Sequence, residues 1–308
     1  MIRTETFAVS LARADALALL AGIFRRSGAA EPVREARLAL CAACGLTPAD
    51  LIGSPGQPIG AAAARLAEFA ERRALGEPLS RIVGRREFWG MALSISPDVL
   101  DPRPETETLV EAALEVFGAR RDEALRILDL GVGSGAILCA LLSEFPAAHG
   151  VGLDVSAAAA AVARRNVEAC GASDRAEIRV GDWTDGLEGE FDLIVSNPPY
   201  VRSADIDRLP PDVRDYDPRV ALDGGDDGLD GYRIILPSSA KLLAPEGWLL
   251  AEMGAGQEAE LLSMAANAGY RDCASKKDLA GVARVLLAAS PRASVGSCDR
   301  HGFAIAGA

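Results

Sequence analysis

The sequence predicts an α/β protein in which a small N-terminal helical domain is joined by a β-hairpin to a doubly wound, mainly parallel sheet. Two observations predict this arrangement. Apolar residues before Gly76 recur at helical spacing. After Pro104, short apolar runs alternate with helical patterns, which is typical of parallel strands covered by helices on both faces. A chain of 308 residues, 49% of them hydrophobic and 25% charged, is long enough to bury both parts.

The helical front spans residues 10 to about 76, and we place this domain over residues 1–78. Glycines and prolines divide it into about four helices. Thr47 directly before Pro48 predicts an N-cap with proline in the first turn of a helix. The apolar residues of the first helix predict one buried stripe, formed by Leu11, Leu17, Leu20 and Phe24.

Residues 80–96 change to three short β-like runs, RIVG, REFW and ALSIS. Gly84 and Gly90 separate these runs, and glycine is the residue that most readily adopts the positive φ of tight turns. We therefore predict a β-hairpin that links the two domains over residues 79–104.

The remaining domain, residues 105–289, alternates between predicted strands and helices. Strands are expected at residues 126–130, 150–154, 177–180, 192–196, 248–253 and 282–287. Helices are expected near residues 105–117, 135–145, 156–170, 228–243 and 256–268. In such sheets ligands bind beyond the carboxyl ends of the strands, so candidate functional residues should follow strands. Residues 290–308 are rich in Ser, Gly and Ala and are expected to form a loose tail.

Charge and composition exclude several classes of protein. A net charge of −12 disfavours a long nucleic-acid footprint, which needs many basic contacts to phosphates. No apolar run approaches the roughly 18 residues of a membrane span, and the first residues lack the basic-then-apolar order of a secretory signal. The six cysteines form no disulfide framework. We therefore expect a cytoplasmic, monomeric protein that contacts neither membrane nor nucleic acid directly.

No metal is expected. Cys41 and Cys44 form one C-x-x-C, but no second pair follows at zinc spacing and both fall in a helical pattern, so small buried helix residues are the favoured interpretation. The acidic run at residues 222–230 lacks the alternating spacing of a calcium loop and favours a turn that caps a helix.

The first candidate loop is glycine-rich and follows the first strand of the sheet, in ILDLGVGSGAI at residues 127–137. Gly131 and Gly133 permit positive φ and close approach of a ligand, whereas Gly135 should let the following helix pack tightly on the strand. The pattern of Gly131, Gly133 and Ala136 also fits a dinucleotide-binding turn. The loop alone therefore leaves the ligand open.

The second candidate loop follows the next strand and begins with Asp154. A carboxylate at this point can accept two hydrogen bonds from the vicinal hydroxyls of a ribose, although it could equally be an acid at a helix N-terminus. Ser156 should cap the next helix. Asp182 and Trp183, after the third strand, offer a polar acceptor and an aromatic face for an adenine, with plain packing as the alternative for Trp183.

The third candidate loop is the most specific: Asn197-Pro198-Pro199-Tyr200 follows the fourth strand. Consecutive prolines fix φ and restrict the residues before them, so the side chain of Asn197 and the carbonyl of Pro198 are held as stiff hydrogen-bond acceptors. Two acceptors of this kind can grip an NH₂ group. Tyr200 adds a flat wall against a planar amide or base.

These three loops together resemble the class I S-adenosylmethionine-dependent methyltransferases that modify exocyclic or amide nitrogen. More narrowly, four segments are similar to the HemK/PrmC family of peptide chain release factor glutamine methyltransferases. They are VGRREFWGMALSISPDVLDPRPETETLVE at residues 83–111, SNPPYV at 196–201, DPRVALDGGDDGLDGYR at 217–233 and DLAGVARV at 278–285. The similarity covers about residues 80–288 and is weaker in the helical front, which agrees in size and helical character. Asp101 departs from the apolar residue usual in this family, which bears on the packing of that loop.

The resemblance implies methyl transfer from S-adenosylmethionine to the side-chain amide nitrogen of the glutamine in the Gly-Gly-Gln loop of release factors. It implies cofactor contacts for Gly131, Val132, Gly133, Ser134, Gly135, Asp154, Trp183 and Asn197. It implies substrate contacts for Asn197, Pro198, Pro199, Tyr200, Phe88 and Arg103, with Asn197, Pro198 and Tyr200 as the catalytic residues. The loop of residues 103–106 is expected near the glutamine.

The chemistry agrees with this expectation. An amide nitrogen is a poor nucleophile because its lone pair is delocalised into the carbonyl. Two acceptors on its hydrogens, Asn197 Oδ1 and the Pro198 carbonyl, would localise that lone pair and stabilise the positive charge that develops on nitrogen.

Two alternatives remain open from the residues alone. An adenine-N6 methyltransferase acting on nucleic acid would use the same grip on an exocyclic amine, but it would want a basic or aromatic-rich surface, and only 5% of this chain is aromatic. A non-catalytic scaffold could keep the fold without the chemistry. We also hypothesise that residues 1–76 recognise the body of the release factor.

Overall fold

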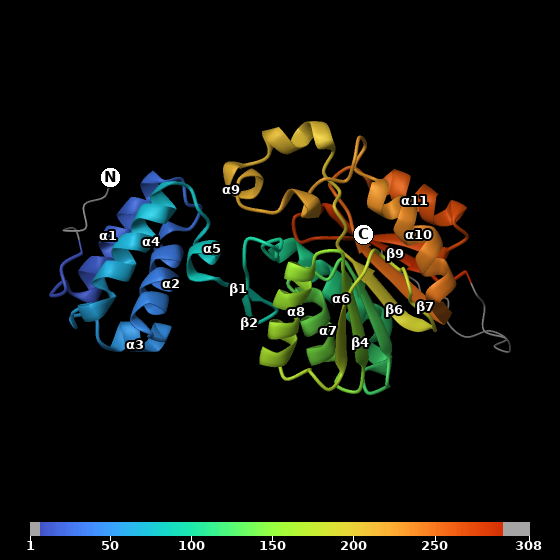
Figure 1. Ribbon diagram of the computed structural model, residues 1–308, viewed down its shortest axis with the longest axis horizontal. Coiled ribbons are helices and arrows are strands. Elements are labelled where there is room, and N and C mark those ends of the chain that lie inside the picture. Colours follow the sequence, from blue (N-terminus) through green and yellow to red (C-terminus); the bar gives the residue numbers. More distant parts are fainter. Residues whose placement is uncertain (1–6, 292–308) are drawn as a thin grey trace. The chain divides into compact units, whose positions relative to one another are not determined.

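The computed structural model describes residues 7–291, which form two compact units, each described here by itself (Figure 1). Among the described residues, the first unit contains residues 7–102 and 204–222. The second contains residues 103–203 and 223–291. Beyond Pro291, the expected loose tail over residues 290–308 lies outside the described residues.

The first unit begins with helices that enclose an apolar core. These are α1 (Arg13–Arg26), α2 (Pro32–Cys44), α3 (Pro48–Gly53), the 3₁₀ turn η2 (Gly60–Ala62) and α4 (Ala63–Ala74). Leu20 and Phe24 are fully buried, and Leu11 and Leu17 are half-buried against the same core, so the predicted stripe is confirmed. Thr47 forms a capping box with Asp50 at the start of α3, as the sequence predicts.

The prediction of a strand for the first of the three runs, RIVG, is wrong. Residues of RIVG form the short helix α5 (Leu79–Val83), which begins after Pro78 and ends at Gly84 with φ of 73°. Proline is tolerated at a helix start and left-handed glycine ends a helix, and these two signals outweigh the β-branched residues between them. Cys41, in α2, is buried and Cys44 is half-buried, as expected of helix residues.

The β-hairpin is confirmed over a shorter range. Strand β1 (Arg85–Phe88) pairs antiparallel with β2 (Met91–Ser94). Trp89 and Gly90 join them with φ of 51° and 70°. Glycine adopts this left-handed conformation without strain, so Gly90 suits the turn, whereas the same conformation is strained at Trp89.

A segment distant in sequence completes the first unit. It carries the 3₁₀ turns η5 (Ser203–Arg208) and η6 (Arg219–Ala221) with the short helix α9 (Pro211–Arg214) between them. The buried carboxylate of Asp217 forms an ion pair with Arg81 of α5 and accepts a hydrogen bond from the backbone NH of Asp101, with N···O of 3.2 Å. Arg81 also donates to the carbonyl of Val99 at 2.7 Å. Residues 204–222 are thus fastened to the hairpin region by a buried ion pair.

Asp101, the residue unusual for the resembled family, has polar partners. Its Oδ2 accepts a hydrogen bond from the hydroxyl of Ser80 at 2.5 Å, and its Oδ1 lies 3.6 Å from Nε of Arg86. A buried carboxylate is tolerated where hydrogen bonds and a cation compensate for lost hydration. The loop before Arg103 therefore accommodates the acid by local pairing.

The second unit is a seven-stranded, mainly parallel sheet, which confirms the predicted fold class. The strands are β3 (Arg126–Leu130), β4 (His149–Asp154), β5 (Ala176–Val180), β6 (Phe191–Ser196), β7 (Leu243–Glu252), β8 (Arg271–Lys277) and β9 (Ala283–Ala289). Their order is β5-β4-β3-β6-β7-β9-β8, parallel from β5 to β7 and antiparallel for the last two pairs. The order reverses beside β3, where such sheets bind ligands.

Helices pack on both faces of this sheet (Figure 1). One layer holds α6 (Glu107–Phe117), α7 (Ala136–Glu144) and α8 (Ala157–Ala169), in which α6 contacts α7 and α7 contacts α8. The other layer holds α10 (Asp230–Leu242) and α11 (Glu258–Asn267), which contact each other. The α10–α11 layer and the sheet form a core whose central side chains are buried, among them Tyr232, Leu249 and Leu286. A 3₁₀ turn, η4 (Gly118–Arg120), follows α6.

One strand was missed by the sequence analysis. Strand β8 has the sequence RDCASKK and lies at the edge of the sheet, where it pairs only with β9. An edge strand is paired along only one of its two hydrogen-bonding edges, so it is less enclosed and needs no continuous apolar pattern. Its half-buried and exposed residues therefore gave no hydrophobic signal.

Candidate active site

Three parallel strands bring the candidate loops to one edge of the sheet. In the register of the sheet, Leu130 pairs with Leu153 of β4 and with Ser196 of β6. The hydroxyl of Ser196 also donates to the carbonyl of Leu130 at 2.8 Å. Ser196 pairs in turn with Ala251 of β7. The residues that follow each of these strands therefore start at the same level, at the carboxyl ends where ligands bind.

The glycine-rich loop after β3 has the backbone expected of a ligand-binding turn. Gly131, Gly133 and Gly135 all have positive φ, at 73°, 52° and 81°. A Cβ added at Gly131 would meet no atom within 4 Å, so its space is open, whereas one at Gly135 would lie 3.3 Å from Ala163 of α8. Gly135 thus permits close packing of α7 against α8, rather than against the strand as predicted. Val132 and Ser134, between these glycines, are buried.

Asp154 joins the second loop to the first. Its Oδ2 accepts a hydrogen bond from the backbone NH of Gly133, and its Oδ1 accepts one from the NH of Ser156, both at 2.9 Å. Ser156 caps α8 through a hydrogen bond from the NH of Ala159, as predicted. Each carboxylate oxygen keeps a free acceptor position. The structure therefore orients the half-buried Asp154 and leaves it able to accept two further hydrogen bonds.

A second acid, Asp129, lies in the strand before the glycine-rich loop and was not predicted as a site residue. Asp129, in β3, is 1% exposed and neither of its carboxylate oxygens has a hydrogen-bond partner among the described residues. Burial, aided by the negative charge of Asp154, raises the pKa of Asp129 to about 7. The signal available in the sequence was an acid inside an otherwise apolar strand.

The Asn197–Tyr200 corner contacts two residues of other elements. Asn197 Nδ2 donates a hydrogen bond to the hydroxyl of Thr106, just before α6, at 3.3 Å. The phenol of Tyr200 donates to Oε1 of Glu252, at the end of β7, also at 3.3 Å. Burial and the neighbouring Glu252 raise the pKa of the Tyr200 phenol, so it stays protonated at neutral pH. Pro198 between them is buried.

Glu252 was not predicted as a site residue. It is 2% exposed, and burial raises the pKa of its carboxyl to about 7, although the hydrogen bond from Tyr200 acts in the opposite direction. Its position follows from the register, because it comes directly after Ala251, the partner of Ser196. An acid that ends an apolar strand was the available signal.

Glycines let the loop before α10 and the first turn of that helix pack tightly against the Asn197–Tyr200 corner. A Cβ added at Gly224 would lie 2.6 Å from the carbonyl oxygen of Pro199, and one at Gly228 would lie 2.4 Å from that of Tyr200. At Gly231 it would lie 3.1 Å from Cβ of Pro198. Real Cβ atoms do not approach as closely as those at Gly224 and Gly228 would, so these two positions require glycine for steric reasons, whereas a Cβ at Gly231 would need its neighbours to shift by a few tenths of an ångström.

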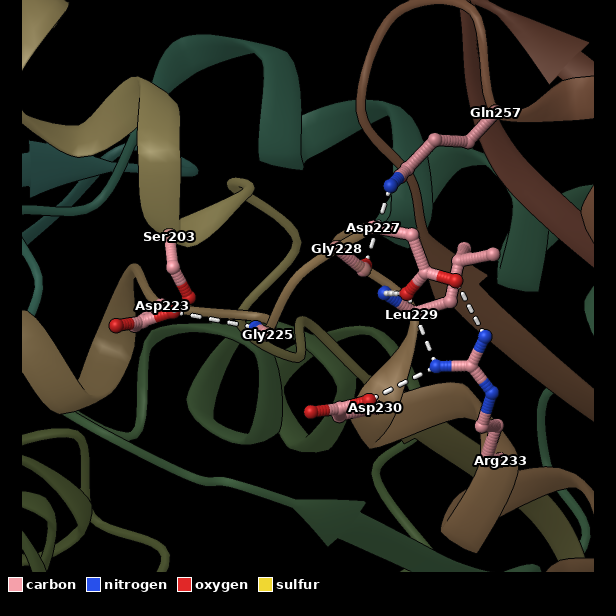
Figure 2. Close-up of polar contacts among 9 residues, drawn as sticks. All are labelled: Ser203, Asp223, Gly225, Asp227, Gly228, Leu229, Asp230, Arg233 and Gln257. Atoms are coloured by element: carbon pink, nitrogen blue, oxygen red, sulfur yellow. Dashed lines mark hydrogen bonds and ion pairs between the residues drawn. The ribbon is translucent and has the colours of Figure 1, made fainter.

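Gln257 links the corner to the segments around Gly228 and Gly254 with three hydrogen bonds. Its Nε2 donates to the carbonyl oxygens of Tyr200 and Gly228, at 3.2 and 3.1 Å, and its Oε1 accepts from the NH of Gly254 at 2.8 Å. Figure 2 shows Gln257 reaching toward Gly228 from the far side of the loop. Because each hydrogen bond goes to the backbone, the half-buried side chain of Gln257 holds the corner independently of the neighbouring side chains.

The acidic run forms the turn before α10. Asp227 is ion-paired with Arg233, which also bonds Asp230 at 2.8 Å, and Ser203 donates to Asp223 at 2.6 Å (Figure 2). The bond from Arg233 lowers the pKa of Asp227 to about 2. Asp223, Asp227 and Asp230 are thus occupied by local contacts that shape the turn around the corner.

The remaining predicted site residues are placed as follows. Trp183 is half-buried against the core with φ of 46°, and its ring lies 3.3 Å from a Cβ added at Gly231, so it approaches the same glycine as Pro198. Burial and Glu252 raise the pKa of Tyr200, and the charge of nearby Arg103 offsets a small part of that rise. Phe88 is buried at the end of β1 and belongs to the other compact unit.

Comparison with known proteins agrees with this geometry. A family model described as "Methyltransferase small domain" matches residues 106–209, and one described as "PrmC N-terminal domain" matches residues 15–84. Two relatives named release factor glutamine methyltransferase are 45% and 46% identical to this chain. The relative from Bradyrhizobium diazoefficiens is aligned over 87% of this chain and 92% of its own. The relative from Rhodospirillum rubrum is aligned over 85% and 80%.

Among solved structures, the hMettl16 catalytic domain in complex with a 3′UTR hairpin superposes with a TM-score of 0.56. The two chains are 19% identical, and the match covers 75% of this chain and 84% of the other. At that identity the likeness concerns the fold alone.

The sheet, the glycine-rich loop and the matching domain model define a class of protein: this chain is a methyltransferase. Its sequence identity to these relatives, over most of their length, also establishes the family. The chain belongs to the release factor glutamine methyltransferases.

Proposed function

We propose that this enzyme transfers a methyl group from S-adenosylmethionine to the side-chain amide nitrogen of the glutamine in the Gly-Gly-Gln motif of peptide chain release factors. The observation that carries the proposal is the orientation of Asn197. Its Nδ2 is engaged by Thr106, so its Oδ1 is left as the acceptor for a substrate NH₂ group. Membership of the family supports the same substrate.

The chain's own residues would activate the amide by accepting hydrogen bonds. Asn197 Oδ1 and the carbonyl of Pro198 would take the two amide hydrogens and aim the nitrogen lone pair. Tyr200 would form a flat wall beside the planar carboxamide, with Pro199 holding the corner stiff and Arg103 adding a further substrate contact. Well-oriented intramolecular reactions gain roughly 7 to 11 kcal/mol from positioning alone. The acceptors also stabilise positive charge on nitrogen in the transition state.

The residues of the glycine-rich loop fit an adenosyl cofactor. Asp154 is held by two backbone NH groups and retains free acceptor positions for two ribose hydroxyls. The backbone of residues 131–135, Val132 and Ser134 included, would line the remainder of the cofactor site, and Trp183 and Asn197 would border it. S-adenosylmethionine, when bound, supplies the sulfonium methyl group.

Three further features belong to this proposal. No helix within residues 7–291 is long and apolar enough to cross a membrane. We propose that the enzyme acts in the cytoplasm, where its proposed substrates take part in translation termination. We propose that it acts as a monomer without contacting nucleic acid directly, in agreement with its net charge of −12. We propose too that the helical domain over residues 1–78, linked through residues 79–104 to the catalytic domain at 105–289, recognises the body of the release factor.

Replacing Asn197 tests the proposal. We expect Asn197→Ala to lower kcat at least about a hundredfold, because losing one well-placed polar contact in the transition state costs roughly 2.7 to 4 kcal/mol. The assay is methylation of a purified release factor, with a Gln-to-Ala variant of its Gly-Gly-Gln motif as the substrate control. Affinity for S-adenosylmethionine is measured in parallel by calorimetry. An Asn197→Ala enzyme with near-native turnover, or methylation of the Gln-to-Ala substrate, would refute the proposal.

A further inference from the structure

We propose that Asn166 is a positioning residue for the cofactor. Its buried side chain fixes the peptide between Ser134 and Gly135, and with it the backbone that the glycine-rich loop presents to S-adenosylmethionine. The inference rests on the cofactor role proposed above for residues 131–135. It assigns a task to a residue of α8 that lies outside the three candidate loops.

The side chain of Asn166 reaches the loop from the neighbouring helix. Its Nδ2 donates a buried hydrogen bond to the carbonyl oxygen of Ser134 at 2.8 Å. Asn166 is 0% exposed, and Ala163 lies three residues earlier on the same face of α8. Ala163 is the residue that a Cβ added at Gly135 would meet at 3.3 Å. The consecutive loop residues Ser134 and Gly135 are therefore both held against this face of the helix.

Hydrogen bonds engage both polar groups of the Ser134–Gly135 peptide. The carbonyl of Ser134 accepts from Asn166, and the NH of Gly135 donates to the carbonyl of Val132 at 2.7 Å. The C=O and N–H of a planar trans peptide point in opposite directions, so two such bonds fix the orientation of its plane. Rotating the peptide would break both bonds and would take this acceptor from a buried amide, which is costly.

The glycine in this peptide explains why the loop needs such a restraint. Gly135 has φ of 81°, and glycine populates positive and negative φ about equally, so its own backbone preference selects neither. The first half of the loop is restrained by β4, because the NH groups of Gly131 and Val132 both donate to the carbonyl of Leu153, at 2.9 and 2.8 Å. Asn166 supplies the corresponding restraint on the second half from α8.

A loop that is already fixed lowers the cost of binding the cofactor. Backbone that has the bound conformation in advance need not be ordered when the ligand arrives, and the apparent affinity follows the fraction of protein in that conformation. Asn166 therefore acts on the affinity for S-adenosylmethionine. It does not act on the methyl-transfer step, because its partner Ser134 belongs to the cofactor loop and not to the Asn197–Tyr200 corner.

The first test removes the hydrogen-bond donor. We expect Asn166→Ala to raise the Kd of S-adenosylmethionine, measured by calorimetry, about fivefold to tenfold, because fewer molecules then hold the loop in its binding conformation. At saturating cofactor, kcat and the KM for the release factor should stay within about twofold of wild type, because bound cofactor selects the same loop conformation. Asn166→Leu fills the space that alanine leaves empty and should raise the Kd by a similar factor.

Val167→Ala is the matched control. Val167 is the adjacent buried residue of α8, and its apolar side chain cannot hydrogen-bond the loop. Its truncation should lower stability in urea unfolding, as the loss of buried methyl groups does, and should leave the Kd at the wild-type value. If Asn166 served only to pack the helix, the two alanine variants would change the Kd equally.

The second test observes the loop in the absence of cofactor. Amide hydrogen exchange of the ligand-free protein reports how often a segment opens. We expect faster exchange at residues 131–135 in Asn166→Ala, because the peptide is then held at one polar group instead of two. Exchange at these residues in Val167→Ala should match the wild type.

Three results would each overturn the proposal. They are wild-type Kd values in both Asn166 variants, equal rises of the Kd in Asn166→Ala and Val167→Ala, and unchanged exchange at residues 131–135 in Asn166→Ala. Failure of the proposed function is a separate result. It would appear as a release factor that is not methylated, whereas calorimetry and hydrogen exchange are measured without a release factor.

Discussion

Asp129 and Glu252 are two buried carboxyl groups whose protonation links the site to stability. Burial is the main cause that raises the pKa of each to about 7, from ordinary values of 3.8 and 4.5. Between the ordinary value and 7 the folded state holds a proton that the unfolded state has released. Each group therefore stabilises the fold fully below its ordinary pKa, and this contribution is lost as pH rises through 7.

Replacing Asp129 by its neutral isostere should remove part of this dependence. We expect wild-type protein to lose stability between about pH 5 and about pH 8, and Asp129→Asn to lose less, by up to roughly 3 kcal/mol. Urea unfolding of the ligand-free protein at both pH values measures the difference. Asp122→Asn, at an exposed aspartate before the same strand, is the control. A variant with the wild-type pH dependence would show that Asp129 is not protonated in the folded state.

At the scale of residues, the sequence predicted those site groups whose chemistry shows in a local motif. Asp154 follows a strand and Asn197 precedes two prolines, and the structure orients both. Glu252 and Gln257 escaped prediction because their partners, Tyr200 and Gly228, are far away in the sequence. Contacts of that kind depend on strand order and register, which no local pattern encodes.

At the scale of elements, the loop before α10 is shaped by the Asn197–Tyr200 corner on which it packs. Gly228 has φ of 79° and would place a Cβ 2.4 Å from the carbonyl oxygen of Tyr200. Gly256 has a similar φ of 89° but nothing within 4 Å. Both glycines therefore have a backbone conformation that other residues rarely adopt, but only Gly228 also lacks the space for a side chain.

Substituting each glycine by alanine separates these effects. Gly256→Ala should cost about 1 kcal/mol of stability from backbone strain, with turnover close to wild type. Gly228→Ala must also displace the carbonyl of Tyr200, and we expect kcat to fall at least about tenfold, because small displacements of positioning groups are costly. Thermal unfolding and release factor methylation give the two readouts. Equal kcat values for the two variants would contradict the packing argument.

The elements themselves were predicted where a periodic apolar pattern fills them. The strands from β3 to β6 and the helices α6 to α8 lie within a few residues of their predicted positions. Helix α5 was mistaken for a strand because five residues are too few to show a helical period, and its Pro78 and Gly84 boundaries decide the structure. Edge strand β8 has no apolar face to reveal it.

At the scale of the whole molecule, the catalytic unit gathers its site from segments far apart in the chain. The glycine-rich loop, Asp154 and the Asn197 corner follow β3, β4 and β6, while Glu252 ends β7. Parallel strands bring these ends together, so one fold places the residues proposed to bind the cofactor beside the corner proposed to grip the amide. The segment 204–222, which leaves the catalytic unit directly after the corner, belongs instead to the first unit.

The central claim is that the Asn197-Pro198 corner grips a planar carboxamide beside the cofactor. A crystal structure of the enzyme with S-adenosylhomocysteine and a Gly-Gly-Gln peptide measures this directly. We predict the glutamine amide nitrogen within hydrogen-bonding distance of both Asn197 Oδ1 and the Pro198 carbonyl oxygen, with Asn197 Nδ2 still on Thr106. A glutamine bound elsewhere, or an Asn197 side chain turned away from the peptide, would contradict the account.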